Sequence, residues 1–330
     1  MRALVVRGAD DVSLDDIQMP LVDEGHVLIQ PLVSGLCGTD LEIIAGTIDE
    51  AYVHYPVALG HEWVGRLAEH PDEGPLVVVE GIIPCGACDE CQRGATNRCR
   101  TYDEIGFTRN GALAEFISVP AHLVHELHPE VNALDAVLTE PMAVVWRALT
   151  RAQVVEGSRC LVIGDGTVAL LSALLLQRFS PGTVTMLGLR PAQSLLAHQA
   201  GVDDFVTDVG ERRFDFVIEA AGQGPAIATA LSCADRGGVI VLLGLPAHGT
   251  SVELYPDDVV NNDLVIQGSF SYTRQSWAQV VGLLNDREIR PSFLVTHRFD
   301  LTQWRDALDT LARSPSDEPR GKVVITLDND

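Results

Sequence analysis

A glycine-rich turn between a strand and an apolar helix constrains the fold of this chain more than any other feature. Residues 159–163 have strand character, residues 164–169 read Gly-Asp-Gly-Thr-Val-Ala, and an apolar helix is expected over residues 170–178. In such a turn the backbone can approach a pyrophosphate, and the helix N-terminus faces its charge. From about residue 157 strand and helix patterns alternate, which predicts a doubly wound parallel sheet that binds a dinucleotide. The cofactor-binding candidates in the turn are Gly164, Gly166, Thr167 and Val168.

The end of the second predicted strand, residues 183–187, bears on which dinucleotide binds. NAD-binding proteins usually carry an acid here that bonds the ribose 2′-hydroxyl, whereas this chain has Gly188, followed by Leu189 and Arg190. Glycine removes the charge that would repel a 2′-phosphate, and the planar guanidinium of Arg190 suits phosphate. We therefore expect NADP to be favoured over NAD, with two parallel N–H bonds from Arg190 to the phosphate. The alternative is that Arg190 is a surface residue in a loop.

Three more strands are predicted over residues 214–219, 238–243 and 264–268. Ligands of doubly wound sheets lie outside the carboxyl ends of the strands, so the turns that follow these strands should line the nicotinamide half of the site. The candidates there are Ala221, Gly244, Leu245, Ser269 and Phe270.

The rest of the chain has a different pattern. Residues 1 to about 80 contain short strands separated by turn residues, which predicts a β-rich lobe. Residues 134–148 are expected to be helical, with a break at Pro141. The last sixty or so residues predict two amphipathic helices, an exposed loop and a strand, over residues 277–285, 304–312, 314–319 and 321–327.

Cys37 and His61 are ligand types that suit zinc. Cys37 directly precedes a predicted short helix over residues 39–45, where a thiolate is favoured. A catalytic zinc has three protein ligands and an open fourth position. The third candidate is Glu140, a carboxylate in an apolar run that is costly unless it is paired or bound to metal. Glu62, next to His61, is the competing candidate, and we expect Glu140 in the resting state.

Four of the seven cysteines cluster in one short segment, at Cys85, Cys88, Cys91 and Cys99. In a cytosolic protein such a cluster favours a metal over disulfides. Four thiolates close a tetrahedral zinc and leave no position for chemistry, so this site should be structural. Unrelated cysteines and electron-transfer iron are the alternatives. Cys160 and Cys233 are expected to be small buried hydrophobic residues.

The bulk properties exclude several classes of protein. A length of 330 residues suggests two domains, and the sequence has no apolar stretch of the roughly 18 residues that a membrane span needs. The first residues have strand character and are too short a run for a signal peptide, so we expect a cytoplasmic protein. A net charge of −23 argues against nucleic acid or an anionic membrane as a partner.

Taken together, the motifs resemble those of the zinc-dependent medium-chain alcohol dehydrogenases. They are Cys-Gly-Thr-Asp over residues 37–40, Gly-His-Glu over residues 60–62, the four clustered cysteines, and Glu-Pro at residues 140–141 before a glycine-rich turn. The Glu-Pro version is similar to the polyol, sugar and threonine dehydrogenase branch, and the resemblance covers nearly the whole chain.

The resemblance implies an α/β protein with two domains. Residues 1–150 and 271–330 would form a β-rich, GroES-like, zinc-binding catalytic domain, and residues 151–270 a doubly wound Rossmann domain. It also implies two zinc ions per chain, one catalytic and one structural, and a homodimer or homotetramer. Lys322 stands where the family often has a basic residue near the cofactor phosphates; a surface lysine is the alternative.

The implied reaction is reversible hydride transfer between NADP(H) and an alcohol or ketone, with zinc lowering the pKa of the alcohol oxygen. Thr39 would begin a proton relay and Asp40 would orient His61, although both residues could instead cap a helix. At Glu42, where many relatives have histidine, the sequence looks like some glucose dehydrogenases. Glu42 could relay a proton, hold a sugar hydroxyl or be a solvated helix residue.

The substrate is the least constrained part of the prediction. The expected pocket residues mix polar and apolar groups, which suits a polyol, sugar or cyclitol and does not exclude a simple secondary alcohol or a threonine-type amino alcohol. These residues are Glu42, Ile48, Tyr52, Phe107 and Arg109. Two other classes are a zinc-free reductase of the quinone reductase type and a non-catalytic zinc- and nucleotide-binding protein.

Overall fold

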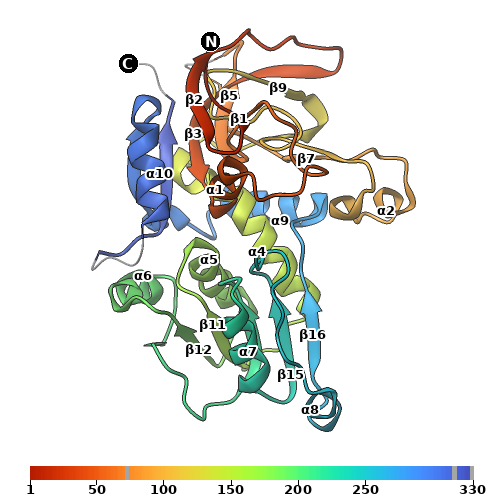
Figure 1. Cartoon of the computed structure of the whole chain (residues 1–330), viewed down its shortest axis with the longest axis vertical. Helices are drawn as coiled ribbons and strands as arrows, with labels where there is room; N and C mark the ends of the chain where they lie inside the picture. The colour runs from red at the N-terminus through yellow and green to blue at the C-terminus, as the bar shows by residue number, and fades with distance from the viewer. Residues whose placement is uncertain (71–73, 314–317, 328–330) are drawn as a thin grey trace. The chain divides into compact units, whose positions relative to one another are not determined.

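The computed structural model describes residues 1–70, 74–313 and 318–327. The chain divides into two compact units. Unit 1 contains Met1–Glu140, Thr273–Arg313 and Lys322–Asp330, and unit 2 contains Pro141–Tyr272 and Ser314–Gly321. Figure 1 labels many of the helices and strands and colours the chain by residue number. Most of the predicted loop at residues 314–319 lies outside the described residues.

Unit 1 is built from β-sheets. A three-stranded sheet has the order β2-β1-β4, and a seven-stranded sheet has the order β10-β6-β5-β3-β18-β17, with β9 paired to β3. The strands are β1 (Arg2–Gly8), β2 (Asp11–Asp16), β3 (His26–Leu36), β4 (Val57–Ala58), β5 (Glu62–Leu67), β6 (Val77–Val79), β9 (Ile117–Pro120), β10 (Val124–Glu126), β17 (Val295–Asp300) and β18 (Lys322–Thr326). A separate pair is formed by β7 (Ile82–Ile83) and β8 (Asp103–Glu104).

The central strand β3 is flanked by two segments that are remote from each other in the sequence. β5 pairs with it antiparallel and aligns Glu62 with Gly35, and β18 pairs on the other edge and aligns Val323 with Leu36. Segments near the two chain ends, red and blue in Figure 1, therefore lie side by side. This pairing brings Glu62 and the start of β18 to the end of β3, directly before Cys37.

Unit 1 also contains five α-helices among the described residues. They are α1 (Gly38–Ala45), α2 (Asp89–Gln92), α3 (Ala133–Ala136), α9 (Arg274–Asn285) and α10 (Trp304–Ala312). α10 buries Trp304, Ala307 and Leu308 in a core that also contains residues from β1, β3 and β18. The predicted amphipathic helices at residues 277–285 and 304–312 are confirmed, and α9 begins three residues earlier than predicted, where Thr273 caps it.

The predicted helix break at Pro141 was wrong in its position. The interruption falls at Val137 and Leu138, between α3 and α4 (Thr139–Ala152), and Pro141 lies in the first turn of α4. The N–H groups of a first helical turn have no partner within the helix, so a proline there sacrifices no hydrogen bond. The proline is therefore compatible with a helix that begins at Thr139 and continues to Ala152.

Unit 2 is a doubly wound Rossmann fold, as predicted. All five strand pairs of its six-stranded sheet are parallel, in the order β13-β12-β11-β14-β15-β16. The strands are β11 (Arg159–Ile163), β12 (Thr183–Leu187), β13 (Asp204–Val206), β14 (Phe214–Glu219), β15 (Ala234–Leu242) and β16 (Val265–Gly268). The chain moves outward from β11 to β13 and then returns to β14, so the strand order reverses beside β11, where such sheets bind their ligands.

The helices of unit 2, besides most of α4, are α5 (Thr167–Leu176), α6 (Ser194–Gln199), α7 (Gly224–Cys233) and α8 (Pro256–Asn261). α5 is nearly all apolar and is buried along most of its length, which is why it reads as a continuous apolar run.

Short 3₁₀ turns of both units lie at Thr96–Arg98, Ala121–Leu123, Gln177–Phe179, Pro191–Gln193, Pro291–Leu294 and Leu301–Gln303. Among the described residues, no helix combines the length and the apolar composition that crossing a bilayer requires.

Candidate functional site

The first group of candidate ligands lies where β3 ends and β5 begins. Cys37 is the N-cap of α1, His61 directly precedes β5, and Glu62 is the first residue of β5. One ligand atom from each of the three lies within 4.8 Å of the others. His61 and Glu62 are buried and Cys37 is half-buried. A thiolate, an imidazole and a carboxylate at this separation can converge on one metal ion.

Asp40 contacts both Cys37 and His61. Its Oδ2 accepts a hydrogen bond of 2.8 Å from the backbone N–H of Cys37, and its Oδ1 lies 3.5 Å from Nδ1 of His61. Burial alone would lower the pKa of His61, but the charge of Asp40 raises that pKa well above its ordinary value. The two roles considered for Asp40, capping α1 and contacting His61, are therefore compatible in one side chain.

The other two candidates on α1 differ in their surroundings. The Oγ1 atom of Thr39 lies 3.6 Å from Sγ of Cys37, so its hydroxyl is next to the ligand group. Glu42 is exposed on the helix surface. Of the three interpretations of Glu42, a solvated helix residue agrees best with this position.

Lys322 has different surroundings from those the sequence suggested. Its side chain is 3% exposed, and its Nζ atom donates hydrogen bonds to Oε2 of Glu62 and, at 3.2 Å, to the carbonyl oxygen of Leu36. A Cβ atom on Gly35 would lie 2.6 Å from Oε2 of Glu62, so this glycine makes room for the pair. The alternative of a surface lysine is wrong, because the side chain is buried against a ligand candidate, and the contact with the cofactor phosphates stays a prediction.

Glu140 lies close to the same group without belonging to it. In the described part of the chain, the group within 4.8 Å contains Glu62 and not Glu140. The pKa of Glu140 is raised to about 8, because burial disfavours its charge and the carboxylate of Glu62 repels it. Glu62 has Lys322 as its direct counter-ion, whereas the charges of His61 and Lys322 only partly offset the rise in the pKa of Glu140.

Glu104 is a site residue that the sequence analysis missed. It lies on β8, and burial raises its pKa to about 7, an effect that the nearby charge of His61 reduces. Its charge also acts on Glu140. No ligand spacing in the sequence indicates Glu104, because it comes to this place through the packing of the backbone at Gly106 against Gly60 and His61.

Two of the predicted pocket residues have defined contacts. The ring of Phe107 packs against that of His61, with centroids 5.1 Å apart. Arg109 is exposed and forms an ion pair with Asp103, at 2.8 Å. Ile48 packs at the edge of the apolar core, and Tyr52 is exposed. Phe107 therefore lies beside the candidate ligands, whereas the charge of Arg109 is already paired.

The four clustered cysteines form the second group of candidate ligands. Their Sγ atoms lie within 4.8 Å of one another, with 3.5 Å between Cys88 and Cys91 and 4.0 Å between Cys88 and Cys99. Backbone N–H groups of Ala87 and Cys88 lower the pKa of Cys85 to about 6. All four are free thiols, a set that suits a closed tetrahedral site. Cys160 and Cys233 are buried, as predicted.

In unit 2, the glycine turn after β11 has the geometry that a dinucleotide requires. Gly164 has φ of +116°, and a Cβ atom there would lie 3.2 Å from the backbone nitrogen of Ala221. Gly166 is the N-cap of α5, so Thr167 and Val168 open the first turn of that helix. The backbone N–H groups at this helix end are the kind that bind phosphate.

The turns after β14, β15 and β16 are fixed by local contacts. The buried carboxylate of Glu219 accepts 2.8 Å hydrogen bonds from the N–H groups of Ala221 and Gly222. A Cβ atom on Gly244 would lie 2.2 Å from the nitrogen of Gly222, so these two turns pack backbone against backbone. Oγ of Ser269 accepts a 3.0 Å hydrogen bond from Arg147, and the next residue, Phe270, is exposed, as is Leu245.

The end of β12 requires a correction to the predicted role of Arg190. Its Nε and Nη2 atoms donate hydrogen bonds of 3.0 and 2.7 Å to Oδ1 of Asp165, in the glycine turn. This edge of the guanidinium is therefore occupied, and the two parallel bonds to a phosphate that the sequence analysis expected are not available from it. There is also a steric reason for glycine at position 188, because a Cβ atom on Gly188 would lie 2.5 Å from the ring of Phe205.

Known proteins are similar to this chain along nearly its whole length. Residues 23–129 match the family described as alcohol dehydrogenase GroES-like domain, and residues 133–314 match the family described as glucose dehydrogenase C-terminus. D-altritol 5-dehydrogenase of Agrobacterium fabrum is 30% identical, over 94% of this chain and 96% of its own. Sorbitol dehydrogenase of Bacillus subtilis is 26% identical, over 94% and 93%. A putative zinc-binding dehydrogenase of Sinorhizobium meliloti, solved with NADP bound, superposes with a TM-score of 0.90 at 24% identity, over 99% of both chains.

A GroES-like unit with two groups of zinc-type ligands, followed by a Rossmann unit, defines the class of zinc-dependent medium-chain alcohol dehydrogenases, and this chain belongs to that family. Within the family it falls in the polyol dehydrogenase-like branch. The chain is thus an oxidoreductase that acts on alcohols.

Proposed function

We propose that this protein is a zinc-dependent dehydrogenase that transfers a hydride between NADP(H) and a carbinol carbon of a polyol, sugar or cyclitol. The observation that carries the proposal is the group of Cys37, His61 and Glu62, whose ligand atoms lie within 4.8 Å of one another. Around this group lie two further carboxylates with raised pKa values, those of Glu104 and Glu140. In this assignment residues 1–150 and 271–330 form the catalytic domain, and residues 151–270 bind the dinucleotide.

The ligand atoms fit zinc. Within the described residues, neither Oδ1 of Asp40 nor Nδ1 of His61 has a hydrogen-bond partner, and the two atoms lie 3.5 Å apart. A metal on the imidazole would fix the ring and make the Asp40 contact a supporting one. Bound there, zinc would act as a Lewis acid toward the alcohol or carbonyl oxygen. We propose Cys37, His61 and Glu140 as the resting ligands, with Glu62 as the alternative third ligand.

The remaining roles belong to residues of the chain itself. Asp40 orients His61, and the hydroxyl of Thr39 passes the alcohol proton towards solvent. A second zinc, held by the four clustered cysteines, stabilises the fold. The proposed dinucleotide contacts are the turns at the carboxyl ends of the strands, namely Gly164, Gly166, Thr167, Val168, Gly188, Leu189, Arg190, Ala221, Gly244, Leu245, Ser269 and Phe270.

The proposed substrate class rests on hydrogen-bonding capacity. Glu104 and Glu140 can accept hydrogen bonds from neighbouring hydroxyls of one substrate, and a site that makes such bonds rejects analogues without the hydroxyls. The names of the relatives, D-altritol 5-dehydrogenase and sorbitol dehydrogenase, support a polyol. The alternatives are a simple secondary alcohol and a threonine-type amino alcohol, and a non-catalytic zinc- and nucleotide-binding protein is the alternative of another class.

We also propose a homodimer or homotetramer. β16 is the last strand in the order of the unit 2 sheet. Its Val265 is 51% exposed, and Val260 on the preceding helix α8 is 78% exposed. An exposed apolar strand at a sheet edge is suited to pairing with another chain, and a second copy would remove both side chains from water.

A substrate panel tests the proposed function. The zinc-loaded enzyme is offered polyols, sugars, cyclitols, secondary alcohols and L-threonine, each with NADP and with NAD, and nicotinamide absorbance is recorded. We expect turnover with polyhydroxylated substrates, a higher kcat/KM with NADP, and two zinc ions per chain by metal analysis. Activity confined to simple alcohols or threonine would reject the substrate class, and a zinc-free active enzyme would favour a reductase of the quinone reductase type.

A further inference from the structure

Asp165, between the two glycines of the turn after β11, is saturated with hydrogen bonds. Its Oδ2 accepts from the backbone N–H groups of Leu189 and Arg190, at 3.0 and 2.9 Å. Its Oδ1 accepts from Nε and Nη2 of Arg190, at 3.0 and 2.7 Å. A carboxylate offers about four acceptor positions, so these four donors use its whole capacity. Asp165 therefore ties the loop after β12 to the glycine turn.

The same contacts determine what Arg190 can offer to a ligand. A third bond of 3.0 Å runs from Nη2 of Arg190 to the carbonyl oxygen of Asp165. Of the five N–H bonds of a guanidinium, Nε and Nη2 carry three, and these three are directed at Asp165. The side chains are 8% and 13% exposed, so water screens the pair only weakly. Arg190 thus retains the two N–H bonds of Nη1 for other partners, and its charge is largely offset.

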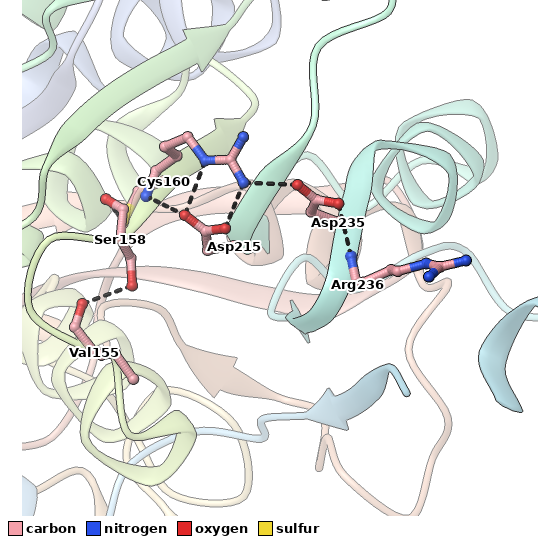
Figure 2. Close-up of polar contacts among 7 residues, drawn as sticks. Val155, Ser158, Cys160, Asp215, Asp235 and Arg236 are labelled. Carbon is pink, nitrogen blue, oxygen red and sulfur yellow. Dashed lines mark hydrogen bonds and ion pairs between the residues drawn. The ribbon is translucent and has the colours of Figure 1, made fainter. Parts of the chain in front are cut away.

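An equivalent pair at the opposite end of the sheet serves as a reference. Asp215 accepts hydrogen bonds from the backbone N–H, Nε and Nη2 of Arg159, the first residue of β11, at 2.8, 3.0 and 2.6 Å. Figure 2 shows that Asp215 and Asp235 both bind the same guanidinium. This pair lies at the amino ends of the strands, away from the edge where ligands bind, and its side chains are 49% and 40% exposed.

A second arginine of unit 2 lies near Asp165. Gln193 binds the backbone of Arg320 from both sides, at 2.6 Å to its N–H and 2.8 Å to its carbonyl oxygen. Burial and then the charge of Arg190 lower the pKa of Arg320, and the charge of Asp165 opposes this change. Two arginines, Arg190 and Arg320, and one aspartate, Asp165, lie near the end of β12. Asp165 therefore offsets half of the formal positive charge of the two arginines.

We propose that Asp165 is the residue that limits the preference for NADP over NAD. By holding the Nε and Nη2 edge of Arg190 and offsetting its charge, it makes the 2′-phosphate less favourable than Gly188 and Arg190 alone would. The inference rests on the proposed function, in that a nicotinamide dinucleotide binds at this turn. Asp165 acts through Arg190 and is a positioning residue.

Equilibrium binding to the zinc-loaded enzyme tests the inference without turnover. The probes are adenosine 2′,5′-bisphosphate and adenosine 5′-monophosphate, and the measured quantity is the ratio of their Kd values by calorimetry. We expect Asp165→Asn to raise the selectivity for the bisphosphate about tenfold, the effect of one charge in a partly shielded site. Asp215→Asn, the matched control, should leave the ratio unchanged. With Arg190→Ala present, adding Asp165→Asn should change the ratio by less than about twofold.

Three outcomes would overturn the inference. They are an unchanged ratio in Asp165→Asn, a loss of bisphosphate binding in that variant, and a drop of about a hundredfold in bisphosphate affinity on Arg190→Ala alone. If Asp165→Asn does not fold, Asp165→Ser and the single Arg190→Ala variant give the same decision, since an offset arginine should contribute only about threefold. Failure of both probes to bind the wild type would reject dinucleotide binding itself, which distinguishes that result from a wrong role for Asp165.

Discussion

The two groups of candidate zinc ligands in unit 1 are assembled in opposite ways. The four cysteines come from one segment, residues 85–99, and a short helix and a 3₁₀ turn bring their Sγ atoms together. Cys37, His61 and Glu62 come from the ends of two paired strands, and Lys322 reaches them from a third strand near the C-terminus. The four cysteines are ligands of one type. Cys37, His61 and Glu62 are mixed ligands surrounded by ionisable side chains.

The two groups are therefore suited to different roles. Four thiolates complete the coordination of a zinc ion, so the free energy of zinc binding stabilises the folded state. Three mixed ligands would leave a position open on a zinc ion, and the ionisable side chains of Asp40, Glu104 and Lys322 lie beside this group. Variants of Cys37, His61 and Glu62 should therefore change turnover, and variants of the four clustered cysteines should change stability.

The largest effect is expected from Cys37→Ala. Loss of the thiolate should empty the site of Cys37, His61 and Glu62 and remove a Lewis-acid contribution of several kcal/mol, which lowers kcat/KM by about 10³-fold or more. The zinc of the four cysteines should remain, so metal analysis should fall from two zinc ions per chain to one. Cys233→Ala, a buried cysteine of unit 2, is the control and should keep both ions. A variant that loses both ions would mean that the groups are not independent.

The next effect is on stability, from Cys88→Ala. An incomplete ligand set should release the structural zinc, and the midpoint of thermal unfolding should fall by about 10 °C or more. Differential scanning calorimetry, with zinc content measured in parallel, checks this. If the variant keeps the wild-type midpoint, the four cysteines contribute nothing to folding and the contrast between the groups is lost.

Zinc affinity should separate the two candidate third ligands. Glu140 is a half-buried carboxylate with a raised pKa, whereas Glu62 already has Lys322 as its counter-ion. We expect Glu140→Gln to weaken the catalytic zinc about 100-fold, and Glu62→Gln about tenfold, in line with supporting contacts of metal sites. Competition with a chromophoric chelator measures both values. The reverse order would make Glu62 the resting ligand.

The metal-free protein should depend on pH in a defined direction. In the folded chain the pKa of Glu140 is about 8 and that of Glu104 about 7, against 4.5 for both in the reference state. The folded state then binds more protons between these values, so the free energy of unfolding should fall as pH rises from about 4.5 to about 8. Urea denaturation of chelated protein at pH 5 and pH 8 measures this, and Glu140→Gln should flatten the dependence. Zinc binding releases that proton, so zinc affinity should rise over the same range.

The smallest effect concerns substrate hydroxyls. Glu104→Gln keeps the shape of the side chain and removes its charge, so KM for a polyol should rise about tenfold, with kcat changed less than threefold and simple secondary alcohols unaffected. Glu42→Gln, on the exposed face of α1, is the matched control and should change KM by less than about twofold. Equal effects of the two variants would show that Glu104 does not contact substrate.

The sequence by itself determined the features that depend on local spacing. The four cysteines, the glycine turn between β11 and α5, and the strand and helix periods of unit 2 are read within about twenty residues, because turns and metal knuckles are made by neighbours along the chain. Cys37 and His61 were found the same way, since each is marked by its adjacent residues.

Only the tertiary structure decided which side chains meet from distant segments. Lys322 reaches Glu62 because β18 pairs with β3, and Glu104 lies near His61 because the backbone at Gly106 packs against Gly60 and His61. Asp165 takes the edge of Arg190 that the sequence assigned to a phosphate, because β11 and β12 lie side by side and their following turns meet. The physical reason is that a strand pattern predicts a strand and which face it buries, while the choice of its partner, and so of the partner's charges, depends on the packing of the whole unit.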